Sequence, residues 1–343
     1  MKSKIIFLFS ILAIFLVNLL KDNIDPYYYT ILIYIGINII LASSLNLING
    51  FTGQFSLGHA GFMAIGGYLS IALSAYFAPF FNSVFGTGEF GQNITFVILM
   101  LAGGLAAAVT GLIVGVPSLR LKGDYLAIVT LGFSEIIRVI IQGMDVIGGS
   151  QGFRGVYIYS NGVKSLSMID ELSPAGFTFY GVPKYTNFFW TFTVAAIIVF
   201  FIYNLMYSTY GRGFLAVKDD EIAAESMGVN TTKFKVMAFV SGAFFAGVAG
   251  SLYGHFNLYL NPEDFNFLKS FEIVVMVILG GMGSIPGVII AAAILTILPE
   301  LLRGISEYRM IVYALLLIIM MLTRPQGLFG VKLHVRKKSK KKT

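Results

Sequence analysis

Long apolar runs separated by short polar segments dominate the pattern of residues along this chain. A helix needs about 20 consecutive apolar residues to cross the hydrocarbon core of a bilayer, and most of the runs come close to that length. The pattern therefore predicts an all-α integral membrane protein, a polytopic bundle of about 8–10 transmembrane helices. The runs cover approximately residues 5–20, 27–48, 55–78, 94–116, 125–142, 188–207, 236–256, 271–283, 286–302 and 308–323.

The pair 271–283 and 286–302 is the least regular part of this pattern. Its first member has only 13 residues, which is short for a crossing helix. Gly280–Pro286, with three glycines and a proline, breaks the helix between the two runs. Ten crossings follow if both runs span, and eight follow if two runs merge or drop out.

Composition supports the membrane interpretation. The chain is 57% hydrophobic and only 12% charged, with a mean hydropathy of +0.81, whereas a soluble domain of 343 residues needs far more polar surface. The apolar runs are also too long for the strands of a membrane barrel. Because the chain has no cysteine, disulfides, thiolate metal sites and a cysteine nucleophile are excluded.

The first 20 residues imitate a signal peptide, with a basic start followed by a 16-residue apolar run. No small-x-small cleavage site follows that run, so we expect an uncleaved first span rather than a removed signal.

Charge sets the expected orientation. The net charge of +7 gathers in the C-terminal HVRKKSKKKT, which is typical of a cytoplasmic anchor beside anionic lipid rather than of a nucleic-acid surface. Ten crossings from a cytoplasmic N-terminus place 16 Lys and Arg residues inside and 7 outside, in agreement with the positive-inside rule. We therefore expect both termini in the cytoplasm, one transmembrane domain over residues 1–330 and a basic tail over 331–343.

The residues Ser208–Lys235, here called the polar island, lie between two apolar runs and hold eight of the 41 Asp, Glu, Lys and Arg residues. The topology places them in the cytoplasm. Asp219 is the expected N-cap of a short helix that Gly228 ends, and Asn230 or Thr231 caps the next span. Ile222, Ala223 and Met227 share one face of this helix. That face is either a docking surface for another protein or an amphipathic surface that lies on lipid.

The residues 45–68 form a glycine-dense segment. Gly58, Gly61 and Gly66 permit close helix packing, and Gly50–Gly53 favours a helix break. Polar side chains at membrane depth indicate either the lining of a transport path or a tight interface whose polar groups are satisfied. These side chains are Gln54, Ser56 and His59; the histidine alone is more typical of a structural role, because no metal-ligand spacing surrounds it.

Glu135 and Arg138 are spaced i, i+3 within the span 125–142 and can form an ion pair. Intramembrane charge suggests function, but no ladder of carboxylates accompanies the pair, and we favour a structural role. The chain contains no G-x-x-x-x-G-K-[ST] motif, so nucleotide would have to be bound by another subunit.

Four stretches, residues 45–70, 123–140, 211–254 and 270–287, together resemble the permease family of branched-chain amino acid ABC importers, specifically its M-type subunits. In such importers a cytoplasmic helix of the permease docks on an ATPase subunit through Glu-Ala-Ala-x-x-x-Gly. Here Ile222 occupies the Glu position. The resemblance implies ATPase-coupling residues Asp220, Glu221, Ala223, Ala224, Glu225 and Gly228.

The same resemblance implies partners and a cell location. We expect two ATPase subunits that carry ATP and Mg²⁺, a sister H-type permease, and an extracytoplasmic binding protein received by the loop Gly143–Asn187. This chain would bind no cofactor and would not be an enzyme. It would lie in the cytoplasmic membrane of a bacterium or archaeon and work by alternating access.

The cargo implied is a branched-chain amino acid, whose carboxylate can use helix N-termini exposed at glycine-rich breaks. Permeases for urea and short-chain amides carry very similar motifs and remain an alternative. An ion-coupled secondary carrier is a more distant one, and a membrane enzyme lacks the nucleophile or metal group it would need. The candidate path residues are Gly53, Gln54, Ser56, Gly58, His59, Gly281, Gly283 and Ser284.

Overall fold

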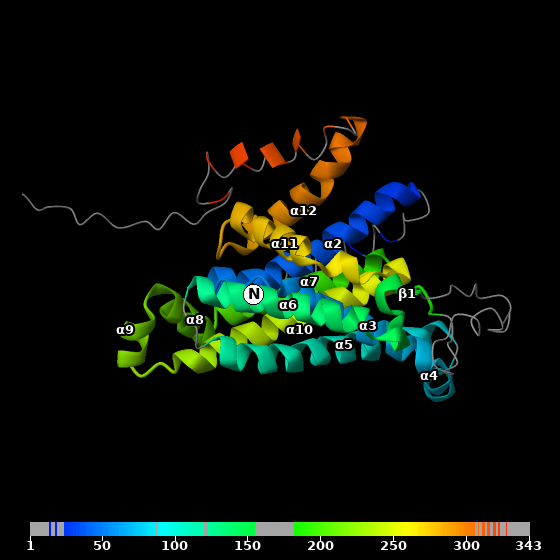
Figure 1. Ribbon diagram of the computed structural model, residues 1–343, viewed down its shortest axis with the longest axis horizontal. Coiled ribbons are helices and arrows are strands. Elements are labelled where there is room, and N and C mark those ends of the chain that lie inside the picture. The colour runs from blue at the N-terminus through cyan, green and yellow to red at the C-terminus, as the bar shows by residue number, and fades with distance from the viewer. Residues whose placement is uncertain are drawn as a thin grey trace, which may run out of the picture.

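A computed structural model describes residues 24–86, 88–119, 123–154 and 182–305, together with isolated positions near both ends of the chain. Most of the long apolar helices run roughly parallel to one another (Figure 1). Within the described residues, five helical segments are long and apolar enough to cross a membrane. There are six if α3 (His59–Tyr76) and α4 (Ala78–Phe85), which are bent by 72° at the break between them, count as one segment. The five are α2 (Pro26–Asn46) with its continuation η2 (Leu47–Phe51), α5 (Glu89–Ser118), α6 (Asp124–Gln142), α7 (Phe188–Met206) and α10 (Thr231–Asn257).

The prediction of a polytopic helical membrane protein is confirmed. The helix predicted over 55–78 was wrong at its start. Residues 53–58 are not helical, and α3 (His59–Tyr76) begins only after them. Outside the described residues lie the tail 331–343, all but two positions of the predicted span 5–20, and half of the predicted span 308–323.

The short runs form two separate helices, α11 (Phe267–Gly280) and α12 (Ile285–Leu301), and η6 (Leu302–Ile305) follows them. Lys269 lies in the first turn of α11 and pairs with Glu272 at 2.9 Å.

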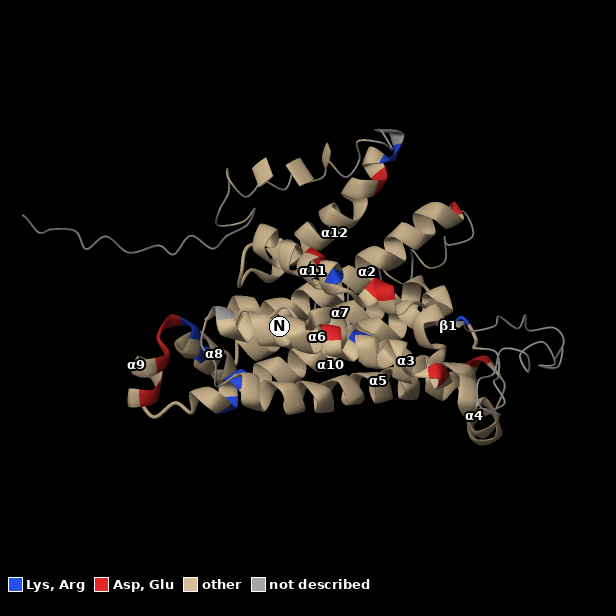
Figure 2. Cartoon of the chain, viewed as in Figure 1, with Lys and Arg blue, Asp and Glu red and all other residues tan. Residues whose placement is uncertain are grey.

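The two ends of the bundle differ (Figure 1). One end carries α8 (Thr209–Asp219) and α9 (Glu221–Ser226), and the other carries α4 (Ala78–Phe85) and β1 (Phe153–Arg154). Charged residues gather around α8, α9 and the start of α10, as Figure 2 shows. The polar island and the described part of the predicted outer loop therefore lie at opposite ends.

The predicted outer loop pairs with the segment that follows α10. It contains η3 (Asp145–Ile147), η4 (Gly149–Gln151) and β1. The strand β1 pairs antiparallel with β2 (Tyr259–Leu260), with Phe153 opposite Leu260. The short helix η5 (Pro262–Phe265) follows β2 and leads into α11. Residues 155–181 of the predicted loop lie outside the described residues.

Glycines bring α3, α5 and α10 into close contact. A Cβ on Gly66 would fall inside the backbone of Gly247, and the Ser251 hydroxyl donates to the carbonyl of Gly66 at 3.2 Å. Small residues of this kind let membrane helices approach closely enough for backbone contact. The prediction that Gly58, Gly61 and Gly66 serve close packing is confirmed, since Gly58 lies against Thr130 and Gly61 against Ser134.

The helix α2 lies inside the bundle, where it contacts α7, α10, α11 and α12. Every residue from Ile35 to Asn46 is buried, as expected for a helix that is apolar on all sides. Polar contacts also link its side chains to neighbouring helices. Tyr34 donates to the Asn257 side chain at 2.9 Å, and the Asn38 amide donates to Thr296 at 2.8 Å.

Candidate functional site

The polar island folds into two helices joined at Asp220. The Asp220 carboxylate accepts hydrogen bonds from the backbone N–H groups of Ile222 and Ala223, at 2.9 and 3.0 Å. Asp220 is therefore the N-cap of α9, one residue later than the predicted Asp219, which instead ends α8. The helix α8 itself was not predicted from the sequence.

The C-terminal end of α9 agrees with the prediction. Gly228 adopts a left-handed φ of +82°, and the N–H of Val229 donates to the carbonyl of Ala224 at 3.0 Å, which is the bonding of a Schellman motif. Asn230 then caps α10 by accepting from the N–H of Lys233 at 2.9 Å. These caps hold the short helix in a defined position between α8 and α10.

One side of α9 carries an uncovered apolar surface. Ile222 and Met227 are 71% and 84% exposed, and Ala223 beside them is exposed. No atom of the described residues lies within 4 Å of the position that a Cβ on Gly228 would take. We call Ile222, Ala223, Met227 and Gly228 the α9 tip. A small apolar surface of this kind, held out from a charged end of the protein, is suited to entering a groove on another protein.

The remaining predicted coupling residues hold α9 on the protein rather than form its tip. Ala224 is buried, so its small side chain allows α9 to lie close to its own support. The Glu221 carboxylate pairs with the Lys235 ammonium of α10 at 2.5 Å, and Glu225 accepts from the Thr231 hydroxyl at 2.5 Å. Movement of α9 is thereby tied to the start of α10.

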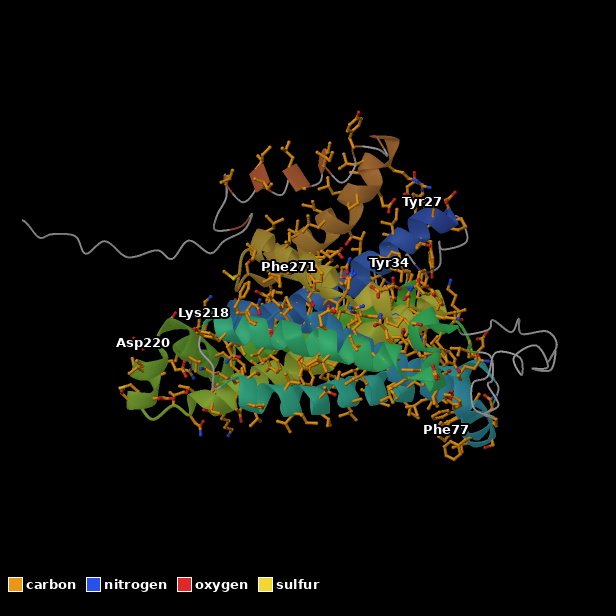
Figure 3. All side chains as sticks on the ribbon, in the orientation of Figure 1. Tyr27, Tyr34, Phe77, Lys218, Asp220 and Phe271 are labelled. Atoms are coloured by element: carbon orange, nitrogen blue, oxygen red, sulfur yellow. The ribbon has the colours of Figure 1, made fainter. Side chains whose placement is uncertain are left out.

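Lys218, one residue before the end of α8, links the polar island to both glycine-rich breaks. Its ammonium donates to the carbonyl of Gly50 at 2.6 Å, and its side-chain stem lies over Gly53. In the same region the Asn46 amide oxygen accepts from the N–H of Gly283 at 2.8 Å. Figure 3 shows Lys218 and Asp220 at the α8–α9 end of the bundle. Segments far apart in sequence thus meet beneath α9.

The first break is held by hydrogen bonds from neighbouring helices. The π-helix η2 ends α2, a geometry that is frequent at functional sites, and Gly53 then turns the chain with a φ of +69°. The N–H of Leu57 donates to the Thr130 hydroxyl at 3.0 Å, and the N–H of Ala60 donates to the Ser270 hydroxyl at 3.1 Å. Such partners replace the water that the bilayer does not offer to a broken helix.

Several candidate path residues are part of that support. Ser56 and His59 are fully buried; the Ser56 N–H donates to Asn49 at 3.1 Å, and the His59 ring bonds to the Ser44 hydroxyl at 2.7 Å. These contacts favour the structural interpretation of His59. Gln54 differs from these two residues. It is 6% exposed, and within the part of the chain that the structure describes neither its amide nitrogen nor its amide oxygen has a hydrogen-bond partner.

At the second break, between α11 and α12, two glycines turn the chain. Gly281 and Gly283 have φ values of +96° and +89°, which strain any residue with a side chain. Ser284 caps α12 by accepting from the N–H of Gly287 at 3.2 Å. Met282 between the glycines is half exposed.

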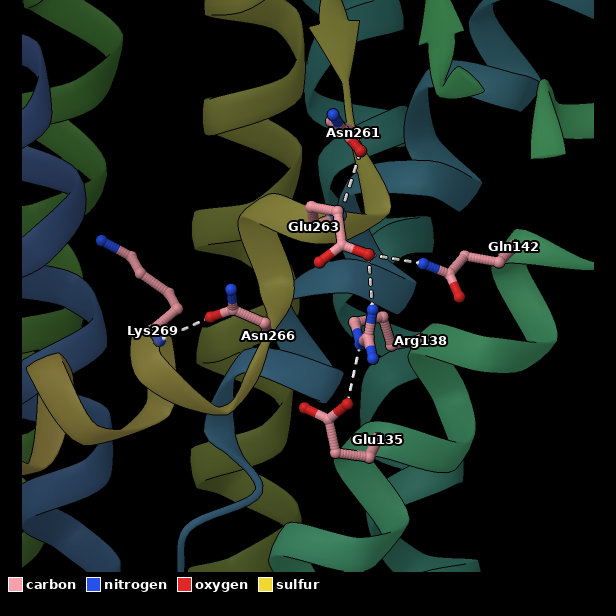
Figure 4. Close-up of polar contacts among 7 residues, drawn as sticks. All are labelled: Glu135, Arg138, Gln142, Asn261, Glu263, Asn266 and Lys269. Atoms are coloured by element: carbon pink, nitrogen blue, oxygen red, sulfur yellow. Dashed lines mark hydrogen bonds and ion pairs between the residues drawn. The ribbon is translucent and has the colours of Figure 1, made fainter. Parts of the chain in front are cut away.

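The intramembrane pair is part of a larger set of polar contacts (Figure 4). Arg138 donates to Glu135 at 2.7 Å, as its spacing predicted, and also to Glu263 of η5 at 2.7 Å. The same Glu263 oxygen accepts from the Gln142 amide at 2.8 Å. The set therefore ties α6 to the turn that precedes α11, which favours the structural interpretation of the pair. The third charged residue was missed because nothing in the sequence pattern places Glu263 beside α6.

Replacing Arg138 by Met is expected to destabilise the protein by about 1–3 kcal/mol, because two charge-assisted hydrogen bonds are lost and Glu263 keeps only its amide partner. Glu135→Gln should cost less, since the amide oxygen still accepts from Arg138. Thermal unfolding of the purified protein measures both. Uptake per folded molecule should be preserved in each variant, and a variant that is fully stable but inactive would instead indicate a functional pair.

Comparison with known proteins places this chain among transport permeases. Residues 27–321 match the protein family described as "Branched-chain amino acid transport system / permease component". The LivM permease protein of the high-affinity branched-chain amino acid transport system of Salmonella typhimurium is 36% identical over 314 residues, which cover 85% of this chain and 67% of the relative.

Two further relatives extend the comparison. A probable branched-chain amino acid transport permease protein LivM of Methanocaldococcus jannaschii is 24% identical over 351 residues, covering 91% of this chain and 96% of that protein. The LivH permease protein of Escherichia coli is 36% identical over 143 residues, covering 41% of this chain and 46% of that protein. No solved structure matches the fold.

Proposed function

The chain belongs to the permease-component family of branched-chain amino acid transport systems, and on that premise we propose that it carries leucine, isoleucine and valine across the cytoplasmic membrane of a bacterium or archaeon. ATP hydrolysis on separate subunits would drive this import, because the sequence has no P-loop of its own. The chain would be a transport subunit without enzymatic activity.

The α9 tip is the observation that carries this proposal. Exposed Ile222 and Met227 on a helix that is capped at both ends form an apolar knob at the end of the bundle where charged residues gather. The helix lies at the positions that the family resemblance assigned to ATPase docking. We propose that two ATPase subunits in the complex bind the permease pair, one at the tip of each permease.

Two routes would transmit the closure of the ATPases. The Glu221–Lys235 ion pair connects α9 to α10, and α10 in turn packs on α3 and α5. Through Lys218, α8 contacts the carbonyl of Gly50, close to the second break at Gly283. A shift of α9 would therefore move the core helix α10 and both glycine-rich breaks together. This is the kind of linked rearrangement that alternating access requires.

A second permease completes the path in this proposal. LivH-type permeases match 41% of this chain, which supports a pair of related subunits with the path between them. At the opposite end, the loop 143–187 and the exposed Phe77, Phe80 and Val84 around α4 would receive an extracytoplasmic binding protein, and Figure 3 shows Phe77 at that end.

Uptake of labelled substrates tests the cargo. A strain that lacks this gene should lose high-affinity leucine uptake and regain it when the gene is restored, while urea uptake stays unchanged. Unaltered leucine uptake in the deletion strain would overturn the proposed cargo, and loss of urea uptake in its place would assign the permease to amides. Uptake that continues after ATP is depleted, with ion gradients maintained, would indicate a secondary carrier.

A further inference from the structure

A pocket of about 330 Å³ lies where the polar island meets the first glycine-rich break. Its volume falls within the ~300–1,000 Å³ typical of small-molecule sites. Gly53 and Gln54 form one wall, the junction of α8 and α9 forms another, and the facing ends of α5 and α6 complete it. Figure 3 shows Lys218 and Asp220, two of the lining residues, at this end of the bundle.

The lining of the pocket divides by chemistry. One set of side chains is apolar and the other carries both signs of charge together with one amide. A ligand that fits must therefore combine an apolar part with a positive and a negative group. The apolar residues are Phe55, Leu119, Leu126 and Val217, and the polar ones include Gln54, Lys218, Asp219 and Asp220.

Gln54 is the strongest sign that this pocket takes a ligand. Gln54 is only 6% exposed, and neither the nitrogen nor the oxygen of its side-chain amide has a hydrogen-bond partner among the described residues. A buried polar group without partners costs about 1–3 kcal/mol, and buried polar groups in proteins are almost always satisfied. A small polar molecule in the pocket would supply the missing donor and acceptor.

The charged side chains that line the pocket differ in whether they already have partners within the protein. Lys235 is paired with Glu221, so neither is free for a ligand. Among the described residues, the Lys218 ammonium donates only to a neutral carbonyl, that of Gly50. A carboxylate would be a stronger acceptor for this ammonium. Within the described part of the chain, the Asp219 carboxylate makes no hydrogen bond or ion pair. The pocket thus offers one exchangeable cation and one available carboxylate.

We propose that this pocket binds a free branched-chain amino acid, as a zwitterion, at the cytoplasmic mouth of the permease. The ligand's carboxylate bonds to Lys218, its ammonium group lies toward Asp219, and the Gln54 amide bonds to either group. The branched tail contacts Leu119, Leu126 and Val217. The choice of amino acid rests on the function proposed above, whereas the zwitterionic character follows from the lining alone.

Occupancy of this site would act on the adjacent break. When Lys218 turns to the ligand carboxylate, the carbonyl of Gly50 loses its donor, and the contact between α8 and the break is released. The ligand then favours the conformation in which this contact is open, because a ligand shifts an equilibrium only through different affinities for two states. The pocket would therefore be the last site that the substrate occupies before its release into the cytoplasm.

Direct binding to the purified transporter complex, without its binding protein and without ATP, tests this site. Labelled leucine should bind the wild-type complex, and Gln54→Leu and Lys218→Met should each weaken that binding about tenfold or more, equivalent to about 1.4 kcal/mol. Lys233→Met is the matched control, since this exposed lysine begins α10 outside the pocket. Size-exclusion profiles of the complex check that each variant is assembled.

Analogues separate the recognition of the two charges. 4-Methylpentanoate, which lacks the ammonium group, and 3-methylbutylamine, which lacks the carboxylate, should both bind more weakly than leucine. Equal binding of leucine to the wild type and to both pocket variants would overturn the proposal, as would the absence of leucine binding to a complex that still imports leucine. Failure of the wild-type complex to import leucine at all is a separate result, and it would overturn the proposed cargo instead.

Discussion

Replacing both Ile222 and Met227 by Asp is expected to abolish ATP-driven uptake while the permease itself remains folded. The two side chains are 71% and 84% exposed and form the apolar part of the α9 tip. Substitutions at exposed positions change stability by only about ±0.5 kcal/mol. Two carboxylates buried in an apolar groove of an ATPase would, in contrast, each require desolvation without a partner, which costs several kcal/mol.

Co-purification measures this effect most directly. The double variant should reach the membrane in normal amount but should no longer bring the ATPase subunits with it. Lys233→Asp is the control, because it changes the net charge by the same two units, lies near α9, and leaves the tip intact. If the double variant still binds the ATPases and imports leucine, α9 is a surface helix that lies on lipid and the docking proposal is wrong.

Local rules predicted α9 from the sequence well. Gly228 and Asn230 have the expected roles because a left-handed C-terminal residue and an Asx cap depend on a few neighbouring residues. The N-cap was displaced by one residue because Asp219 and Asp220 are equally suitable in isolation. Only the end of α8, which the sequence pattern did not reveal, decides between them.

Contacts between distant segments could not be predicted in the same way. The Lys218 ammonium and the Gly50 carbonyl are 168 positions apart, and Arg138 reaches Glu263 over 125. The sequence also could not predict that α2 lies inside the bundle. Lipid is as apolar as a protein interior, so a helix that is apolar on all sides can face either one. The burial of the Ala224 side chain against the rest of the protein also depends on tertiary packing, so it could not be predicted from the sequence.

Replacing Gly50 by Ala is expected to lower uptake about tenfold or more, a loss of about 1.4 kcal/mol in the coupling of the two breaks. A Cβ at this position would stand 2.5 Å from the nitrogen of Gly283 and would collide with the amide oxygen of Asn46. These two atoms form the hydrogen bond that joins the breaks. Because the added methyl group forces them apart, α9 can still engage an ATPase but its movement is transmitted poorly.

The signature of this variant is ATPase binding without transport. Gly50→Ala should co-purify with the ATPase subunits and hydrolyse ATP, while leucine uptake in vesicles falls. Gly132→Ala in α6 is the matched control, since a Cβ there meets nothing within 4 Å and alanine favours a helix over glycine by about 1 kcal/mol. Normal uptake by Gly50→Ala would show that the breaks move independently, and the route from Lys218 through Gly50 to Gly283 would then carry no coupling.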